Sequence, residues 1–487
     1  MQNEKYDVVI IGAGILGCLT ARQLSRYELS ILVVDEAADI AEGATKANTG
    51  VLYAGFHPRG GSLKGISCVQ GNRMHRKLCQ ELDVPVDYTG SLFVAFHEEG
   101  LEKIEDKMKK GRKNGVPEMK MISGDEARMM QPGLSGKVIG AMYCPTTGII
   151  SPFSLVLAAA ENAMDNGVSF MFNTRVKQIE PDRGVSGAEG YILHTDTGTI
   201  RASYVVNVSG EGAAEVESFV RERDLIIKSK SGQFFIFDAP CPVKYVIYQA
   251  EENDEKGTLI APTTDGQMIA GPTSYEVPGF EHTETTRQGH EHIRRVTQKI
   301  LRGIDFGKVI ATFAGVRANI DNVPKEEKDF VLRKSAEHFV SALGIKNPGM
   351  TASPYLAERI IDLLSEDGLP LHENPSFDPV HRFRPLFLKA DRSRQQEMLA
   401  EDPAYGRVIC KCEGITEGDI RHVLRSNLPP HTINGLKKRL RISMGRCQGA
   451  FCIPETIDLL SREWNAEPET ICKGDYGSNY VTGKVRP

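Results

Sequence analysis

The turn at residues 12–17 constrains the fold of this chain more than any other feature. An apolar run at residues 7–11 leads directly into the turn, whose glycines are Gly12, Gly14 and Gly17, and a helical pattern follows. The first glycine permits a tight turn, the second lets the backbone approach a pyrophosphate, and the third allows the helix to pack closely on the strand. The helix N-terminus attracts an anion. The pattern predicts a doubly wound α/β sheet that binds a dinucleotide.

A second predicted strand, residues 30–34, ends in Asp35, which lies 18 residues after Gly17. A carboxylate at this place accepts hydrogen bonds from a ribose hydroxyl, which strengthens the prediction of a dinucleotide site. NAD and FAD both fit this arrangement, so these residues alone leave both open. The small, polar stretch at residues 43–50 suits either a loop that runs along an extended cofactor or an ordinary surface loop.

Four cysteines near the other end of the chain predict a metal centre. Cys410 and Cys412 form a C-x-C pair, and Cys447 and Cys452 follow after a gap of 34 residues as C-x4-C. Two closely spaced pairs suit an iron–sulfur cluster held by four thiolates. Structural zinc is the alternative, although zinc pairs usually have two to four residues between the cysteines. The other six cysteines have no metal spacing, and we expect them to be buried.

The sequence around these cysteines resembles a known family. Residues 433–437 (INGLK) and 444–452 (MGRCQGAFC) are similar to the small helical [2Fe-2S] domain related to bacterioferritin-associated ferredoxin. The resemblance implies a [2Fe-2S] cluster. A bound dinucleotide and a cluster in one chain indicate electron transfer.

Composition bounds the class of protein. The 487 residues are 40% hydrophobic and carry a net charge of −5, which suits a soluble protein of two or three domains and gives no electrostatic reason to expect nucleic acid as a partner. The N-terminus has no signal-peptide pattern, and no apolar run approaches the length of a membrane span. We therefore expect a cytoplasmic protein with at most peripheral membrane association, in which cysteines act as ligands or buried thiols.

The N-terminal region also resembles a known family. Residues 6–55, together with GSLKG at 61–65, are similar to the FAD-dependent D-amino-acid-oxidase superfamily, within it most of all to anaerobic glycerol-3-phosphate dehydrogenase catalytic subunits and L-2-hydroxyglutarate oxidases. Further segments match the same family, and the resemblance spans about residues 5–365 and 407–460. These segments are VVNVSG at 205–210, APTTDG at 261–266 with GPT at 271–273, FAGVR at 313–317 and GMTASP at 349–354.

The resemblance implies FAD as the cofactor and a set of residues that hold it. Amides at the N-terminus of the last matched helix would stabilise the negative charge of reduced flavin, and ordinary helix capping is compatible with that role. The implied cofactor-binding residues are Gly12, Gly14, Gly17, Asp35, Thr45, Asn48, Gly50, Val176, Gly210, Gly349, Met350, Thr351 and Ala352.

The candidate catalytic residues are Arg317, Tyr53 and His57. Arg317 lies in the family's arginine segment, and its permanently charged fork suits a carboxylate or phosphate, with a surface salt bridge as the alternative. Relatives place His-Ala-Gly or His-Ser-Gly where this chain has Tyr53-Ala54-Gly55. Tyr53 would hydrogen-bond the substrate and His57 would act as the base, unless His57 is a packed structural histidine.

We predict three domains. The FAD-binding domain comprises residues 1–90, 150–225 and 330–368, the antiparallel-sheet substrate or cap domain comprises 91–149 and 226–329, and a proline-containing linker at 369–402 leads to a small helical [2Fe-2S] domain at 403–465. Predicted cap strands lie at 232–237, 244–248, 258–261 and 268–269, and predicted helices at 98–114, 153–166, 284–303, 355–364, 416–426, 432–443 and 453–464.

These features predict an FAD-dependent dehydrogenase that oxidises a small anionic substrate. Glycerol 3-phosphate is the first choice, and the alternatives are L-2-hydroxyglutarate or another 2-hydroxy acid, an opine- or proline-type amine, or a non-catalytic electron-transfer subunit. Phosphate recognition needs positive charge beyond Arg317, for which Lys228, Lys230 and Arg333 are candidates. Because the cluster relays single electrons, we expect a hetero-oligomer with a second flavoprotein or another electron-acceptor subunit.

Overall fold

The structure of the protein, a computed structural model, describes residues 5–182, 190–250, 258–324 and 327–483. Its first sheet has eight strands in the order β10-β11-β12-β1-β2-β9, with β20 beside β12 and β19 beside β20. Strands β20, β12, β1, β2 and β9 run parallel, and β10, β11 and β19 pair antiparallel. The strands are β1 (Lys5–Ile11), β2 (Ile31–Val34), β9 (Ser169–Met171), β10 (Val176–Pro181), β11 (Tyr191–Thr195), β12 (Thr199–Asn207), β19 (Val331–Ala336) and β20 (Phe339–Leu343).

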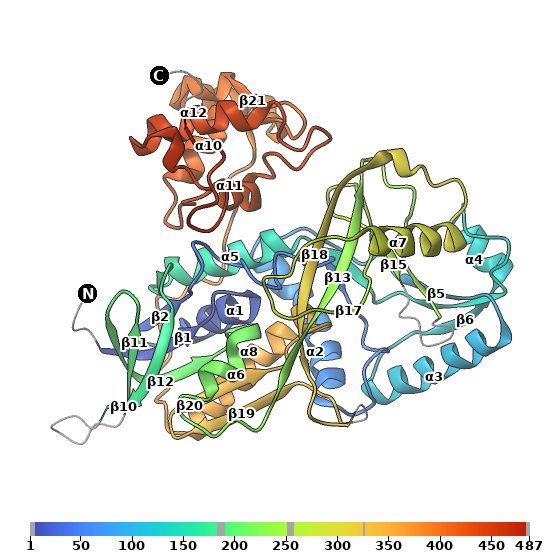
Figure 1. Ribbon diagram of the computed structural model, residues 1–487, viewed down its shortest axis with the longest axis horizontal. Coiled ribbons are helices and arrows are strands. Elements are labelled where there is room, and N and C mark those ends of the chain that lie inside the picture. The colour runs from blue at the N-terminus through green and yellow to red at the C-terminus, as the bar shows by residue number, and fades with distance from the viewer. Residues whose placement is uncertain (1–4, 183–189, 251–257, 325–326, 484–487) are drawn as a thin grey trace.

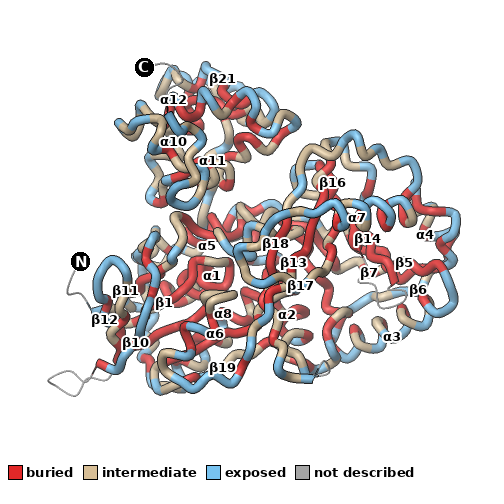
Figure 2. Tube along the Cα trace, in the orientation of Figure 1, coloured by how far each residue is buried: buried red, intermediate tan, exposed pale blue. Residues whose placement is uncertain are grey.

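Both faces of this sheet are covered, as a doubly wound fold requires. Val8 and Ile10 of β1 face a core formed with helices α1 (Ile15–Leu24), α5 (Pro152–Asp165) and α8 (Gly349–Glu366), whereas Val9 and Ile11 face a second core. The sheet is accordingly buried along its centre (Figure 2). The second core includes part of α6 (Ala213–Glu217), and α2 (Leu63–Glu81) packs against α8. The predicted α/β fold is confirmed.

The second sheet has nine strands in the order β17-β13-β16-β15-β14-β5-β7-β6, with β18 beside β13. Alternate residues of β5 (Ser91–Ala95) face helices α3 (Glu98–Asn114) and α7 (Arg287–Ile300), so the two helices cover opposite faces (Figure 1). The other strands are β6 (Lys120–Ser123), β7 (Gly140–Cys144), β13 (Ile227–Phe237), β14 (Val246–Gln249), β15 (Leu259–Pro262), β16 (Met268–Gly271), β17 (Tyr275–Glu276) and β18 (Val309–Ile320), and α4 (Gly124–Met130) flanks β6 and β7. A separate three-stranded sheet contains β3 (Val51–Leu52), β4 (Val86–Asp87) and β8 (Gly148–Ile150).

Helix α8 begins at Gly349, six residues before the predicted start at 355. Pro354 lies inside the helix and has no N–H to donate to the carbonyl of Met350, four residues earlier. The ring nitrogen Nε2 of His75 on α2 lies 3.3 Å from that carbonyl oxygen and can hydrogen-bond it in place of the missing N–H. The first turn of α8 is therefore helical in spite of its proline, a tertiary effect that the local sequence does not encode.

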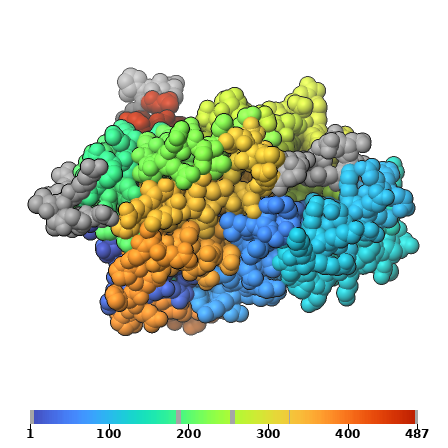
Figure 3. Space-filling view, turned by 90° about the horizontal axis from the view of Figure 1, so that it is seen from below, coloured from blue at the N-terminus to red at the C-terminus, as the bar shows by residue number. Residues whose placement is uncertain are grey.

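The C-terminal domain is a small helical lobe that lies beside α5 and β18 (Figure 1). Its core is formed by residues such as Ile420, Leu436 and Leu460. Its elements are α9 (Arg392–Glu401), β21 (Val408–Cys410), β22 (Ile415–Thr416), α10 (Glu417–Leu424), α11 (Ile433–Leu440) and α12 (Cys452–Trp464). Seen from below, after a 90° turn from the view of Figure 1, most of the surface belongs to the two large sheets and their helices (Figure 3).

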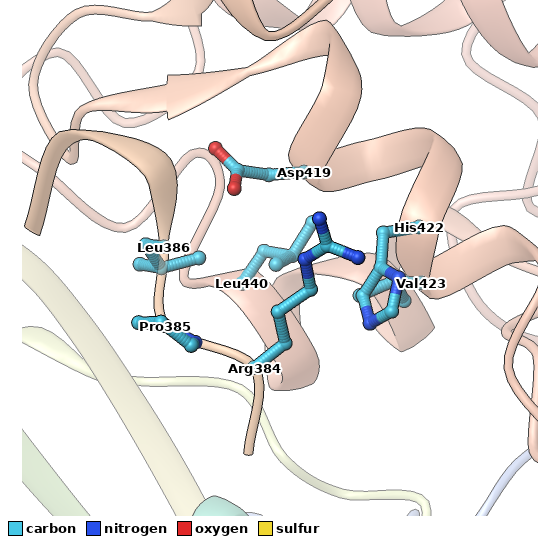
Figure 4. A pocket seen from close by; sticks show the side chains of 7 residues that line it. All are labelled: Arg384, Pro385, Leu386, Asp419, His422, Val423 and Leu440. Atoms are coloured by element: carbon cyan, nitrogen blue, oxygen red, sulfur yellow. The ribbon is translucent and has the colours of Figure 1, made fainter. Parts of the chain in front are cut away.

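The segment predicted as a linker contains α9 and packs on both neighbours. Buried Arg22 of α1 donates to the carbonyl of Pro379 at 2.9 Å, and the amide of Phe387 donates to Asp419 of α10 at 3.0 Å. A pocket of about 30 Å³, roughly the volume of one water molecule, lies between Arg384 and His422 (Figure 4). This segment thus fixes the C-terminal domain to the rest of the chain, and the predicted domain boundaries stay a prediction. None of the described helices is both long and apolar enough to cross a membrane.

A buried ion-pair network joins α11 to the loop that follows β2. Arg439 donates to both oxygens of Asp39, at 2.6 and 3.0 Å, and Lys438 contacts Asp39 at 3.3 Å and Glu42 at 2.5 Å. Burial by itself raises the pKa of Asp39, but Arg439 and Lys438 outweigh it and hold the pKa below its usual range. The C-terminal domain therefore contacts the same loop that carries the nucleotide-binding residues.

Replacing Asp39 with asparagine is expected to weaken this contact by about 3 kcal/mol, because it leaves buried Arg439 without its carboxylate partner and Lys438 with Glu42 alone. Hydrogen exchange of the α11 amides should accelerate by about 100-fold. Because the folded pKa of Asp39 is lowered, its contribution is present above the ordinary carboxyl pKa of about 4 and is lost as the pH falls through the folded value. The matched control is Glu397→Gln, which removes the exposed pair with Arg394 and should change α11 exchange little.

Candidate functional site

The glycine turn after β1 has no room for side chains. Gly12 has φ +112°, and a Cβ there would lie 2.7 Å from the carbonyl oxygen of Val208. A Cβ on Gly17 would lie 1.9 Å from the carbonyl oxygen of Gly12. Gly14 is the N-cap residue of α1. The backbone of the turn therefore lies open at the start of α1, the arrangement that receives a pyrophosphate.

The predicted acid and loop meet this turn. Asp35 accepts hydrogen bonds from the amides of Ala13 and Ala37, at 2.6 and 2.9 Å, and burial raises its pKa. The hydroxyl of Thr45 accepts a hydrogen bond from the amide of Ile15 at 3.2 Å, at the first residue of α1. The loop at 43–50 thus runs past the helix N-terminus and is not a detached surface loop.

The start of α8 packs on the segment that follows this loop. The hydroxyl of Thr351 accepts a hydrogen bond from the amide of Tyr53 at 3.0 Å, and within the loop Asn48 accepts one from the amide of Gly50 at 2.8 Å. A Cβ on Gly71 of α2 would lie 2.0 Å from the carbonyl oxygen of Thr351, so this glycine permits the close approach of α2. The turn of Gly349, Met350, Thr351 and Ala352 therefore lies beside residues 51–53, which continue from the loop at 43–50.

The remaining predicted cofactor residues lie at the sheet. Val176 is buried at the start of β10, and Gly210, with φ +62°, follows the end of β12. The amide of Val208 just before it donates to the carbonyl of Ile11 at 3.0 Å, which places this segment next to the glycine turn. These positions suit the nucleotide end of an extended cofactor.

Arg317 is a partly buried cation with backbone partners. It lies in β18 and donates to the carbonyls of Thr273 at 2.9 Å and Ser231 at 3.4 Å. Burial lowers the pKa of its guanidinium, and Tyr53 partly opposes that effect. Within the described ranges no carboxylate forms an ion pair with it, so the surface-salt-bridge alternative does not hold. A guanidinium with backbone partners alone is matched to an incoming anion.

Lys346 and Lys64 add positive charge to the same place. Lys346, directly before α8, donates from Nζ to Oδ1 of Asn319, which lies two residues after Arg317 in β18. Burial, together with Lys64, Arg317, Lys328 and Lys230, lowers the pKa of Lys346 to about 7. Burial also lowers the pKa of Lys64, which Asp329 opposes. The GSLKG motif at 61–65 contains Lys64 but gave no sign of its role, and no motif contains Lys346, because the fold alone brings the two lysines together.

The other predicted cations are already paired. Lys228 contacts Asp321 at 2.7 Å, and Lys230 contacts Glu276 at 3.1 Å. Arg333 contacts Glu217 at 2.6 Å and also Asp224. Of these three, Lys230 is the one whose charge contributes to the lowered pKa of Lys346. Arg333 is therefore a structural cation of the first sheet, and the prediction that it serves phosphate recognition is not supported.

Tyr53 lies close to the cation Arg317. His57 lies on the other side of the Tyr53 ring, among aromatic side chains. The Tyr53 hydroxyl is hydrogen-bonded to the side chains of Asn347 and Thr49, and burial raises its pKa. The His57 ring is 6.0 Å from that of Tyr53, between centroids, and packs against Phe56, Phe93 and Tyr248 at 4.5, 5.7 and 5.0 Å. The aromatic surroundings of His57 are those of a packed histidine. Tyr248, from cap strand β14, was not foreseen beside this site.

The four predicted metal cysteines form two pairs. The sulfur atoms of Cys412 and Cys447 are 3.5 Å apart. Cys410 is hydrogen-bonded by Cys452, which lowers the pKa of Cys410 to about 6. A Cβ on Gly445 would lie 2.4 Å from Cβ of Cys412, so this glycine lets the two loops meet. In the described part of the chain, no three His, Cys, Asp or Glu side chains gather tightly enough to hold a single ion.

The fold and the two sites identify the family. The model for the FAD dependent oxidoreductases, DAO, matches residues 7–363, and the model for the BFD-like [2Fe-2S] binding domain matches residues 408–462. The chain belongs to the DAO family of FAD-dependent oxidoreductases and carries a [2Fe-2S] domain at its C-terminal end. It is an enzyme that uses FAD and a [2Fe-2S] cluster.

Several known proteins are similar over most of the chain. The glycerol 3-phosphate dehydrogenase of Caloramator mitchellensis is 34% identical, with 99% of each chain covered. One subunit of the anaerobic glycerol-3-phosphate dehydrogenase of Haemophilus influenzae is 23% identical, with 95% of this chain and 86% of that protein covered. The L-alpha-glycerophosphate oxidase structure from Mycoplasma pneumoniae, with FAD bound, has a TM-score of 0.72 and 23% identity and covers 79% of this chain and 100% of that one. That likeness confirms the fold of the two large domains.

Proposed function

We propose that this enzyme oxidises glycerol 3-phosphate to dihydroxyacetone phosphate and passes the electrons to its [2Fe-2S] cluster. The observation that carries the proposal is the pair of partly buried cations Arg317 and Lys64, beside which Lys346 also lies. Arg317 has no carboxylate partner among the described residues, and a phosphate dianion would supply the missing negative charge. The Caloramator relative, similar along its whole length, is named as an enzyme acting on the same substrate.

Each residue of the site has a proposed role. Arg317 binds the phosphate as a fork, and the Tyr53 hydroxyl, whose raised pKa keeps it protonated, orients the substrate as a hydrogen-bond donor. The glycine turn, Asp35 and the loop at 43–50 hold the nucleotide half of FAD, and the amides at the start of α8 lie where charge develops on the flavin. FAD itself supplies the hydride acceptor.

We further propose that Cys410, Cys412, Cys447 and Cys452 hold the cluster and that electrons leave toward a different polypeptide. Cys412 is exposed, so one edge of the cluster site lies at the surface where an acceptor can approach. The Haemophilus relative is named as one subunit of its dehydrogenase, which supports a hetero-oligomer with an electron-acceptor subunit here as well. All ten cysteines are free thiols, which favours a reducing cytoplasmic location.

The proposal is tested by anaerobic mixing of the reconstituted holoenzyme with glycerol 3-phosphate and, separately, with L-2-hydroxyglutarate. Flavin absorbance reports the first electron transfer, and electron paramagnetic resonance reports cluster reduction. We expect glycerol 3-phosphate to bleach the flavin and then to produce the signal of the reduced cluster. Bleaching by L-2-hydroxyglutarate alone would overturn the proposed substrate and make the hydroxy acid the substrate instead. No bleaching by either compound would overturn the proposal.

A further inference from the structure

We propose that Lys346 is the base that accepts the proton of the substrate hydroxyl. This inference rests on the proposed function and names a residue that takes the place of the histidine expected at Tyr53. It begins from the position of Lys346 in the fold. The residue lies in the turn between β20 and α8, next to Asn347, whose side chain bonds the Tyr53 hydroxyl.

The ammonium or amine nitrogen of Lys346 is held in place by the cap domain. Its Nζ donates to Oδ1 of Asn319, and Asn319 Nδ2 in turn donates to the carbonyl of Arg317 at 2.8 Å. Lys346 is thereby connected to Arg317 on one side and, through Asn347, to Tyr53 on the other. A substrate anion bound by Arg317 and oriented by Tyr53 would have its hydroxyl near this nitrogen.

The surroundings of Lys346 favour the neutral amine. Four cations repel a proton on it: Lys64 of α2, Lys230 of β13, Arg317 of β18 and Lys328 of the segment before β19. The nearby carboxylates are engaged elsewhere, since Asp321 contacts Lys228 and Lys328, and Glu276 contacts Lys230.

Burial and this repulsion lower the pKa of Lys346 to about 7. A large fraction of the amine therefore has a free lone pair near neutral pH, which is the condition for a general base.

The other groups at the site are poor bases. Arg317 stays protonated in proteins, and the raised pKa of Tyr53 keeps its hydroxyl protonated. His57 is packed among Phe56, Phe93 and Tyr248, one ring behind Tyr53. Lys346 is the titratable group of the cationic cluster whose ordinary chemistry allows it to take up a proton at neutral pH.

The proposed step balances atoms and electrons. The substrate O–H bond breaks and its proton moves to Nζ of Lys346, which becomes an ammonium. The C–H bond at the same carbon breaks with its electron pair, and this hydride goes to oxidised FAD. The carbon and oxygen form the carbonyl of the product, and the new positive charge on Lys346 lies beside the bound phosphate, which stabilises it.

The decisive variant is Lys346→Arg, because its long side chain keeps a donor to Asn319 but stays protonated and cannot act as a base. In stopped-flow experiments with the holoenzyme and glycerol 3-phosphate, we expect flavin reduction to slow by about 100-fold or more, with substrate affinity changed less than tenfold. The wild-type rate should rise with pH through about 7 and the variant should lose this rise. Lys110→Arg, on the exposed face of α3, is the matched control. Flavin reduction in Lys346→Arg at the wild-type rate would overturn the inference.

A second measurement does not depend on turnover. Acetic anhydride labels only neutral amines, so mass spectrometry of the holoenzyme labelled at different pH values gives the titration of each lysine. We expect half-labelling of Lys346 near pH 7. Labelling of Lys346 only above pH 9 would overturn the inference. Failure of the proposed function would give a different result from failure of this inference: glycerol 3-phosphate would then not reduce the flavin of the wild-type enzyme.

Discussion

Replacing Arg317 with methionine is expected to lower kcat/KM for glycerol 3-phosphate by about 1,000-fold. The guanidinium is partly buried and, among the described residues, pairs with backbone carbonyls alone, so it has an unmet attraction for an anion. Removing one partner of a buried charged pair costs about 2–5 kcal/mol, and about 4 kcal/mol corresponds to this loss. Methionine has a similar length and no charge, so the change removes the fork and retains much of the packing. Steady-state kinetics and stopped-flow flavin reduction measure the effect.

The controls for this prediction separate binding from folding. Arg287→Met makes the same substitution on the exposed surface of α7, where Arg287 pairs only with Glu291, and activity should be unchanged. FAD content and the melting temperature of Arg317→Met should stay close to those of the wild type. Arg317→Lys keeps the charge but loses the fork, and its activity should lie between the two. If Arg317→Met had the kcat/KM of the wild type, Arg317 would not be a substrate-binding residue.

The parts of the fold that could be predicted are those determined by residues close together in the sequence. Strand β1, the glycine turn and the helix after it follow from adjacent residues, and α3 lies at the predicted residues 98–114. Gly115 ends α3 in a left-handed conformation, with φ +85°, which the sequence signals directly. Local patterns of this kind need no knowledge of the tertiary structure.

The parts that the sequence missed depend on contacts between distant segments. Strand β13 is longer than the predicted 232–237 because it pairs with β18 along its whole length, and β18 itself was not predicted. The early start of α8 depends on His75 of another helix. In each case a partner far along the chain decides the local structure.

The candidate site divides in the same way. The nucleotide half could be predicted because Gly12, Gly17 and Asp35 lie within one strand–helix–strand unit. The substrate half could not, because Lys64 and Lys346 come from segments nearly three hundred residues apart and no local motif links them. Arg333 had the right charge, but the fold places it with Glu217 and Asp224. Charge alone therefore does not identify a ligand-binding cation, because the fold decides which cations already have carboxylate partners.

Replacing Cys412 with alanine is expected to abolish the visible spectrum and the electron paramagnetic resonance signal of the [2Fe-2S] cluster. Cys412 and Cys447 form one of two cysteine pairs, with sulfur atoms 3.5 Å apart, and a cluster of this type needs four thiolates. Reduction of the flavin by substrate should persist, because Cys412 lies in the C-terminal domain, whereas Arg317 and Tyr53 belong to the two large domains. Turnover with a one-electron acceptor that depends on the cluster should fall to background.

The matched control is Cys472→Ala, which removes a cysteine of the same domain whose thiol interacts only with the carbonyl of Thr470 among the hydrogen bonds described for it. This variant should keep the full cluster spectrum and full turnover. Iron and sulfide analysis of both proteins would show whether the cluster is absent or only altered. A complete [2Fe-2S] spectrum in Cys412→Ala would contradict its place as a ligand, and loss of flavin reduction in that variant would show that the C-terminal domain supports the flavin site itself. The contact of α11 with the loop after β2 gives that outcome a physical route, since the same loop continues to Thr45, which meets the N-terminus of α1 in the predicted FAD site.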